Sequence, residues 1–254
     1  WLKPFWLKPF WIWPYLALAF GPCTWRFLPA MPIKLQYFDA RGVAETIRLM
    51  LAVAKVDYED ARFSFSFGTP GDMSTIIRPE FDAAKAAGEL TSSFGKLPYL
   101  EVDGVRMAQS KAIERYVAKE FGLGGTSALE FAHIDAICEQ IRDVKEAYQS
   151  AKRGKEGAEK EAALTKWFGE DLPAHMQVIE KVVPGGPFLF GSKVCWADIA
   201  MWQFVAASDG GFFDNTEGAR ASFQGCPKIK AAMEATTAIP ELQAWLEKRP
   251  KTSL

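Results

Sequence analysis

The sequence predicts two domains, a small α/β domain followed by an all-helical domain, on three observations. Residues 31–122 hold strand-type runs separated by helical stripes, and a strand–helix–strand unit followed by a hairpin and a helix builds a mixed-sheet layer. Residues 126–254, beyond the glycine-rich link 122–125, show only helical patterns. The length of 254 residues is enough for two domains of ordinary size.

Strand and helix signals alternate through the first domain. IKLQYF (33–38) is an apolar and aromatic run of strand type, and residues 57–63 alternate as a second strand. Between them, apolar side chains recur at helical spacing: Val43, Ile47, Met50, Leu51 and Ala54. Residues 64–79 contain Gly-Thr-Pro-Gly-Asp (68–72) and predict a loop, long enough to be an insertion.

A hairpin and a helix complete this domain. KLPYLEV (96–102) and VRMA (105–108) predict two strands, with Asp103-Gly104 as their turn. Because proline cannot donate to a sheet ladder, Pro98 at a strand start predicts an edge position or a cis bond. A helical stripe then runs to Phe121, and Gly122 is a natural stop.

The second domain has the pattern of a helical bundle. Its first stripe consists of Ile134, Ile137, Cys138 and Ile141, and a second helical region is marked by Trp167, Leu172, Val178, Ile179 and Val182. The charged stretch 152–161 predicts a solvated turn. WADIAMWQFVA (196–206) predicts the core helix, and PELQAWLEK (240–248) predicts a helix that closes the bundle.

Composition excludes several classes of function. The sequence has 30 Lys and Arg residues against 31 Asp and Glu residues, so the chain has no net positive charge that would attract a polyanion. We therefore expect no nucleic-acid partner. Two histidines and four scattered cysteines without a CxxC pair argue against structural zinc, a dithiol redox motif and a disulfide framework. We therefore expect no metal and a reducing compartment, the cytoplasm.

The first thirty residues are a different kind of sequence. They carry three basic residues and no acid, and the pentapeptide WLKPF occurs twice in tandem. Prolines interrupt the uncharged stretch 9–25, which argues against a spanning helix. A basic flank, an apolar run and Ala17-Leu18-Ala19 before Phe20 form the pattern of a cleavable signal, similar to the plastid-targeting presequences of some algae. Three interpretations stay open: a short duplication upstream of the true start at Met31, a targeting segment to a plastid or other organelle, and an aromatic membrane anchor.

Five segments together carry a resemblance to a known family. They are QYFDARGVAETIR (36–48), GKLPYLEVDG (95–104), QSKAIERYVA (109–118), HIDAICEQIRDV (133–144) and FLFGSKVCWADIA (188–200). In this order they resemble a cytosolic glutathione S-transferase, most of all the sigma class, which uses tyrosine and includes glutathione-dependent prostaglandin D synthases. The resemblance implies a thioredoxin-like domain followed by a helical bundle, a homodimer, and glutathione as co-substrate.

The resemblance assigns the catalytic role to Tyr37. A free thiol has a pKa of about 8.5, and the thiolate is the nucleophile. A hydroxyl that donates a hydrogen bond to the sulfur favours the charged form and lowers that pKa. The other interpretation of Tyr37 is a core tyrosine packed under the sheet.

The resemblance also assigns glutathione-binding positions. With a cis Leu97–Pro98 bond, the backbone of Leu97 would pair with the tripeptide like an added strand. Gln109 and Ser110 open a helix whose N-terminus favours the γ-glutamyl carboxylate, although Ser110 also suits a plain N-cap. The remaining assigned positions are Phe81, Lys85, Lys96 and, from the partner subunit of a dimer, Asp143.

Several positions depart from the family pattern. Val43 replaces the arginine of the prostaglandin synthases, which argues against that narrower activity, and Arg142 replaces an acid of their metal site. Phe81 stands where tryptophan is usual and cannot donate an indole N–H hydrogen bond. Lys96 replaces a common glutamine. Cys195 replaces the Ser or Thr of a helix cap, at a cost of about 1 kcal/mol.

The predicted function is glutathione conjugation to small hydrophobic electrophiles, with peroxide reduction or isomerisation as related reactions. Phe38, Tyr148 and Trp202 are the candidate residues of the electrophile pocket. A redox enzyme on the same fold would need a cysteine within 38–41, and none is there. A catalytically decayed scaffold protein is the alternative, and a membrane-complex subunit would need the first twenty residues as its anchor.

Overall fold

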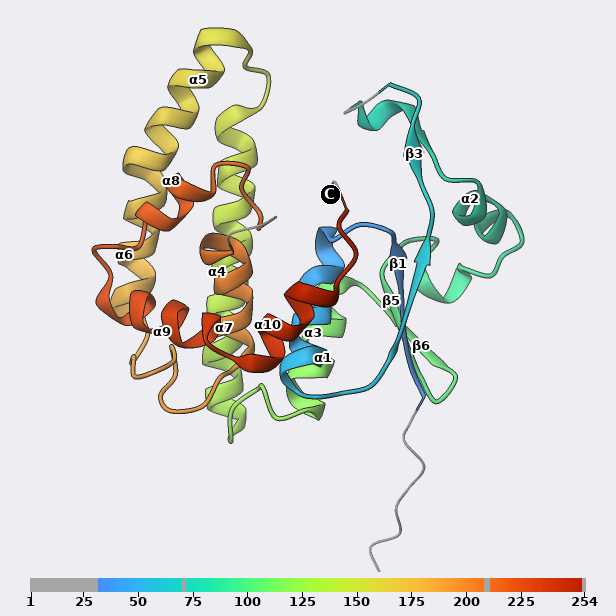
Figure 1. Ribbon diagram of the computed structural model, residues 1–254, viewed down its shortest axis with the longest axis horizontal. Coiled ribbons are helices and arrows are strands. Elements are labelled where there is room, and N and C mark those ends of the chain that lie inside the picture. Colours follow the sequence, from blue (N-terminus) through green and yellow to red (C-terminus); the bar gives the residue numbers. More distant parts are fainter. Residues whose placement is uncertain (1–31, 70–71, 208–210, 253–254) are drawn as a thin grey trace, which may run out of the picture. The chain divides into compact units, whose positions relative to one another are not determined.

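The first half of the described chain contains a four-stranded mixed sheet (Figure 1). The computed structural model describes residues 32–69, 72–207 and 211–252, so the predictions for residues 1–30 lie outside it. The strands are β1 (Ile33–Phe38), β2 (Glu59–Phe63), β5 (Tyr99–Val102) and β6 (Val105–Ala108). Their order is β2-β1-β5-β6, with β1 parallel to β2 and the other pairs antiparallel. The predicted mixed sheet is confirmed.

Three helices pack against this sheet in two separate apolar clusters. A 3₁₀ turn, η1 (Gly42–Ala44), leads into α1 (Glu45–Val53), which lies beside α3 (Ser110–Glu120). The buried side chains of α1 and α3 join the main core. Phe81 of α2 (Pro79–Ala86) belongs to a smaller cluster with Leu90 and Tyr99, and Figure 1 shows α2 on the opposite side of the sheet from α1.

The hairpin between β5 and β6 forms as the sequence predicts. Asp103 and Gly104 have φ values of 50° and 77°, and a two-residue turn with both values positive matches the twist of the flanking strands. The Leu97–Pro98 peptide bond just before β5 is cis. A third 3₁₀ turn, η3 (Thr91–Ser93), precedes this segment.

The segment 64–79 is more ordered than a loop. It contains a small antiparallel pair, β3 (Ser66–Phe67) and β4 (Ile76–Ile77), joined through the 3₁₀ turn η2 (Met73–Thr75). The carboxylate of Asp72 accepts a hydrogen bond from the backbone N–H of Ser74 and caps that turn. The glycine and proline signal was correct for a turn, but it concealed the short strands on either side.

The second half consists of helices, as predicted. They are α4 (Ala128–Lys152), α5 (Gly157–Lys166), α6 (Leu172–Val182), α7 (Trp196–Met201), α8 (Thr216–Ala221), α9 (Pro227–Thr237) and α10 (Pro240–Lys248), with π turns η4 (Trp167–Asp171) and η5 (Trp202–Ala206) after α5 and α7. In the described residues no helix combines the length and apolar character needed to cross a bilayer.

Two details of this half differ from the sequence-based expectation. The charged turn ends earlier than predicted, because α5 already begins at Gly157 and consists mainly of alanine, glutamate, lysine and leucine, which are strong helix formers. In α6, Met176 and Ile179 face the core, whereas Val178 and Val182 are exposed. The apolar residues of α6 therefore extend beyond its buried face.

The centre of the helical half is α7, whose six residues are all buried. At its N-terminus the fully buried carboxylate of Asp198 accepts hydrogen bonds from the backbone N–H of Leu189 at 2.7 Å and of Cys195 at 2.9 Å. The Cys195 thiol donates to the same carboxylate at 3.0 Å, and burial raises the pKa of that thiol. Cys195 is thus a protonated capping residue with a structural role.

We expect Asp198→Ala to lower the free energy of unfolding by about 3 kcal/mol, because it leaves two buried backbone N–H groups without acceptors. Urea denaturation followed by circular dichroism measures this loss. Cys195→Ser is the control, because it restores a hydroxyl at the cap and should stay within about 1 kcal/mol of the native chain. A smaller effect for Asp198→Ala than for Cys195→Ser would contradict this account of the cap.

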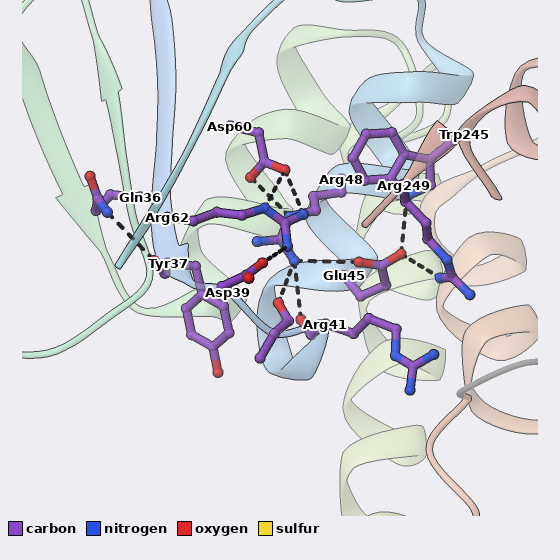
Figure 2. Close-up of polar contacts among 11 residues, drawn as sticks. Gln36, Tyr37, Asp39, Arg41, Glu45, Arg48, Asp60, Arg62, Trp245 and Arg249 are labelled. Carbon is purple, nitrogen blue, oxygen red and sulfur yellow. Dashed lines mark hydrogen bonds and ion pairs between the residues drawn. The ribbon is translucent and has the colours of Figure 1, made fainter. Parts of the chain in front are cut away.

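The last helix packs on α1, and so it does more than close the bundle. The buried carboxylate of Glu45 accepts hydrogen bonds from Trp245 Nε1 at 3.0 Å and from Arg249 at 2.6 Å (Figure 2). Arg48, one turn along α1, lies 3.4 Å from Glu45 and 3.0 Å from the carboxylate of Asp60. We call Glu45, Arg48, Asp60, Trp245 and Arg249 the α1–α10 network.

Candidate active site

Tyr37 stands near the end of β1, next to the turn that begins α1. A Cβ atom on Gly42 would come within 2.6 Å of the Tyr37 hydroxyl oxygen, so the glycine lets the turn pass close to the phenol. Gly42 also has a φ of +42°, which favours glycine. The ring packs edge-on against Phe38, with a centroid distance of 5.6 Å.

The electrostatic surroundings keep the Tyr37 hydroxyl protonated. Partial burial raises its pKa, and this effect outweighs a hydrogen bond from the backbone of Val43 and the charge of Arg48, which both lower it. The Arg48 guanidinium lies 5.8 Å from the ring centroid. Figure 2 shows the hydroxyl turned away from the α1–α10 network. A neutral phenol held in this way is a hydrogen-bond donor at physiological pH.

The hydroxyl belongs to a cavity of about 780 Å³. Tyr37, Gly42 and Val43 line one side of it. The other walls come from α3, α4 and the segment that leads into α8, and the residues there include Ser110, Lys111, Glu114, Arg142, Lys145, Phe212, Phe213, Asp214 and Thr216. A cavity of this size fits a small organic ligand.

Two of the predicted site residues, Tyr37 and Ser110, line this cavity together. Gln109, just before Ser110, has a φ of 72°, a strained value for a residue with a side chain. Asp143 is exposed on α4, next to Arg142 of the cavity wall.

The other predicted glutathione positions gather around the segment that leads into β5. Lys85 is exposed on α2, and its Cε would lie 3.3 Å from a Cβ on Gly95, so the side chain reaches the start of this segment. Lys96 is exposed and Leu97 is half-buried there. Phe81 is buried beneath them and meets Phe38 at 5.2 Å between ring centroids.

The residues predicted for the electrophile pocket do not line the cavity. Phe38 packs against Phe81 and the ring of Phe65. Tyr148 is buried against Trp167 and Phe213, and Trp202 is buried with its indole N–H donating to Thr237 at 2.8 Å. Tyr148 and Trp202, which come from helical segments, pack in the core here, and the role predicted for these three residues stays a prediction.

Lys145 and the pair Phe212-Phe213 line the cavity instead, and sequence reasoning missed them. A signal existed for Lys145, because it follows Ile141 by four positions and precedes Tyr148 by three, on the buried stripe of α4. A lysine on an otherwise apolar stripe indicates that polar surroundings lie beside the helix at that position. The segment 211–216 carries no comparable helical or strand periodicity.

Charges are unevenly paired in this cavity. The buried carboxylate of Glu114 accepts hydrogen bonds from Lys111 Nζ at 2.8 Å and from Trp196 Nε1 at 3.0 Å. Burial, together with the neighbouring charge of Lys111, lowers the pKa of Lys145 to about 8. In the part of the chain that the structure describes, no group of three or more His, Cys, Asp and Glu residues is placed to hold a metal ion.

Comparison with known proteins gives one consistent result. Family models described as the N-terminal and C-terminal domains of glutathione S-transferase match residues 33–119 and 142–249. The chain is 31% identical to glutathione S-transferase 1 of Ascaris suum, over 86% of this chain and 97% of that protein. It is 30% identical to hematopoietic prostaglandin D synthase of Homo sapiens, over 87% of this chain and 98% of that protein.

Solved structures are similar over the same region. A prostaglandin synthase D of Nilaparvata lugens superimposes with a TM-score of 0.65 at 27% identity, covering 87% of this chain and all (100%) of that one. A monomeric glutathione S-transferase of the hookworm Necator americanus gives a TM-score of 0.62 at 30% identity, covering 88% and 100%.

Proposed function

Because this chain belongs to the glutathione S-transferase family, we propose that it conjugates the thiolate of glutathione to small hydrophobic electrophiles, with Tyr37 as the catalytic residue. The observation that carries the assignment of Tyr37 is the position of its hydroxyl, which lies close to Gly42 and the backbone of Val43 at a cavity of about 780 Å³.

The mechanism follows from the ionisation of a thiol. The Tyr37 hydroxyl donates a hydrogen bond to the glutathione sulfur and stabilises the thiolate against its conjugate acid. The thiol proton leaves to solvent, and the thiolate attacks an electrophilic carbon in the cavity. A new carbon–sulfur bond forms while the leaving group departs with the electron pair of the broken bond. Since the phenol stays protonated, it can keep donating through this step.

We assign the tripeptide to the surface between α3 and the segment before β5. The N-terminus of α3 at Gln109 and Ser110 would hold the γ-glutamyl carboxylate, and the backbone of Leu97 would pair with the cysteinyl unit. Lys85 and Lys96 would face the glycyl carboxylate, with the apolar ring of Phe81 beneath. The proximity of Lys85 to Gly95 supports this grouping.

Conjugation is preferred here to a prostaglandin D synthase activity, although the human relative bears that name. Val43 lines the cavity with an apolar side chain at the position where the resemblance places an arginine in those synthases. The cavity and the intact tyrosine also disfavour a decayed scaffold.

We further propose a homodimer in the cytoplasm. Asp143 is exposed on α4, as a residue that reaches a partner's γ-glutamyl amine must be. Three described cysteines, Cys138, Cys195 and Cys226, are unpaired and buried, which suits a reducing compartment. One similar structure is described as monomeric, so sedimentation equilibrium of the native chain and Asp143→Ala tests the assembly.

The function is tested by the ultraviolet absorbance of bound glutathione thiolate as a function of pH. We expect the native chain to lower the apparent pKa of the thiol below the free value of about 8.5. The Tyr37→Phe variant should bind glutathione and return the pKa toward that value. Binding without a shift in the native chain would remove Tyr37 from its role, and no binding at all would favour a scaffold.

A further inference from the structure

The cavity beside Tyr37 contains a cation that conjugation of a neutral electrophile would not use. Lys145 Nζ lies 5.3 Å from the ring centroid of Phe204 and 5.0 Å from that of Phe212. Toward the residues that the structure describes, Lys145 makes no ion pair and no hydrogen bond. The side chain is therefore held by aromatic faces and lines the same cavity as the catalytic tyrosine.

Three of the neighbouring charges, on Glu114, Lys111 and Arg142, already have partners. The carboxylate of Glu114 pairs with Lys111 through both oxygens, each at 2.8 Å, and also accepts from Trp196. Arg142 forms an ion pair with Glu139 on the same helix. Asp214 also faces the cavity, but the lining still holds more basic side chains than acidic ones, namely Arg41, Lys111, Arg142 and Lys145 against Glu114 and Asp214.

Holding an ammonium group in this place is unfavourable without an anion. Partial burial and the charge of Lys111 both oppose protonation of Lys145, yet with a pKa of about 8 the ammonium form predominates at pH 7. A carboxylate that entered the cavity would supply the ion pair that Lys145 does not form with any residue the structure describes. Charge-assisted hydrogen bonds of this kind are stronger than neutral ones.

We propose that Lys145 is a specificity-determining residue, which selects electrophiles that carry a carboxylate at the far end of an apolar body. The apolar part would pack against Phe212 and Phe213, and the reacting carbon would lie toward Tyr37. This inference rests on the proposed function, because it assigns the second substrate of the same site.

A matched pair of glutathione conjugates tests the proposal without turnover. S-hexylglutathione and S-(carboxypentyl)glutathione share the tripeptide and the chain, and differ by a terminal methyl against a terminal carboxylate. We expect isothermal calorimetry of the native chain at pH 7 to give about 10-fold tighter binding of the carboxylated conjugate. Lys145→Met should abolish this preference, and Lys145→Arg should retain most of it.

Lys152→Met is the matched control. Lys152 is on the same helix and also lies over an aromatic ring, 4.4 Å from the centroid of Tyr148, but it does not line the cavity. This variant should keep the native ratio of affinities. A change as large as that of Lys145→Met would show a general charge effect and overturn the proposal.

The remaining outcomes separate this inference from the proposed function. If neither conjugate binds the native chain, glutathione transfer itself fails. If S-hexylglutathione binds but the carboxylated conjugate binds no more tightly, Lys145 is not an anion site and the inference alone fails. Lys145→Met could instead weaken the binding of both conjugates equally, while Lys145→Arg also fails to keep the native ratio of affinities. That result would show that Lys145 has only a structural role and would overturn the inference.

Discussion

Replacing Tyr37 by phenylalanine is expected to lower kcat/KM for conjugation of a chlorodinitrobenzene by about 10- to 100-fold. The ring would still pack against Phe38 and beside Gly42, but the thiolate would lose a donor, and hydrogen bonds to charged groups contribute about 1.5 to 3 kcal/mol. Steady-state kinetics at two pH values measures the effect: pH 6.5 is about two units below the pKa of the free thiol, and pH 8.5 is about equal to it. The loss should be greater at the lower pH, where free glutathione is mostly protonated.

Gly42→Ala provides a second variant that keeps the hydroxyl but moves it. The added methyl would meet the Tyr37 hydroxyl oxygen at 2.6 Å, so the ring must shift. We expect the rate to fall while S-hexylglutathione still binds. If Tyr37→Phe retained the native rate at both pH values, the thiolate would have to be stabilised by another group.

Glu45→Ala is expected to lower the free energy of unfolding by about 3 to 5 kcal/mol, since it removes a buried carboxylate that two guanidinium groups share. Glu45 is the shared partner of Arg249 at 2.6 Å, Arg48 at 3.4 Å and the indole N–H of Trp245 at 3.0 Å. All of these side chains are buried or nearly so. Urea denaturation followed by tryptophan fluorescence measures the loss.

An exposed ion pair between the same two elements is the control. Lys55, just past α1, lies 2.6 Å from Glu241 in α10, and the lysine side chain is 74% exposed. Glu241→Gln should cost less than about 1 kcal/mol, because solvent screens such pairs. Equal effects of the two substitutions would show that the α1–α10 network does not hold these helices together.

Local patterns were sufficient to predict most elements of the fold. The apolar run before Tyr37 became β1, and the Asp103-Gly104 turn joined two strands, because strand periodicity and turn preference act over a few residues. β3 and β4 escaped prediction because strands of two residues have no measurable period. The family resemblance predicted Tyr37 and Ser110 as site residues, and the structure places both in one cavity.

The rest of the site depends on contacts that no local pattern encodes. Tyr148 and Trp202 have the residue types of an electrophile pocket, but the helix packing turns them into the core. Lys145 is exceptional on its stripe, yet only the arrangement of α3, α4 and the Phe212 segment shows that a cavity opens beside it. Likewise, the sequence does not distinguish Glu45 from the other acidic residues, which number 31 in all, and only its contacts in the folded chain show its role.

Synthesis on the ribosome gives the α1–α10 network a further consequence. The partners Trp245 and Arg249 are 200 and 204 positions after Glu45, so the early domain emerges with Arg48 beside this carboxylate but long before its partners from α10. Domains generally fold as units while the chain is being made, but here the first unit lacks two of the partners of Glu45 until α10 has been synthesised. A nascent chain arrested before α10 would hold a less stable sheet domain than the released protein. The packing of α10 on α1 therefore also supports the start of α1, which lies three residues after Gly42 of the tyrosine cavity.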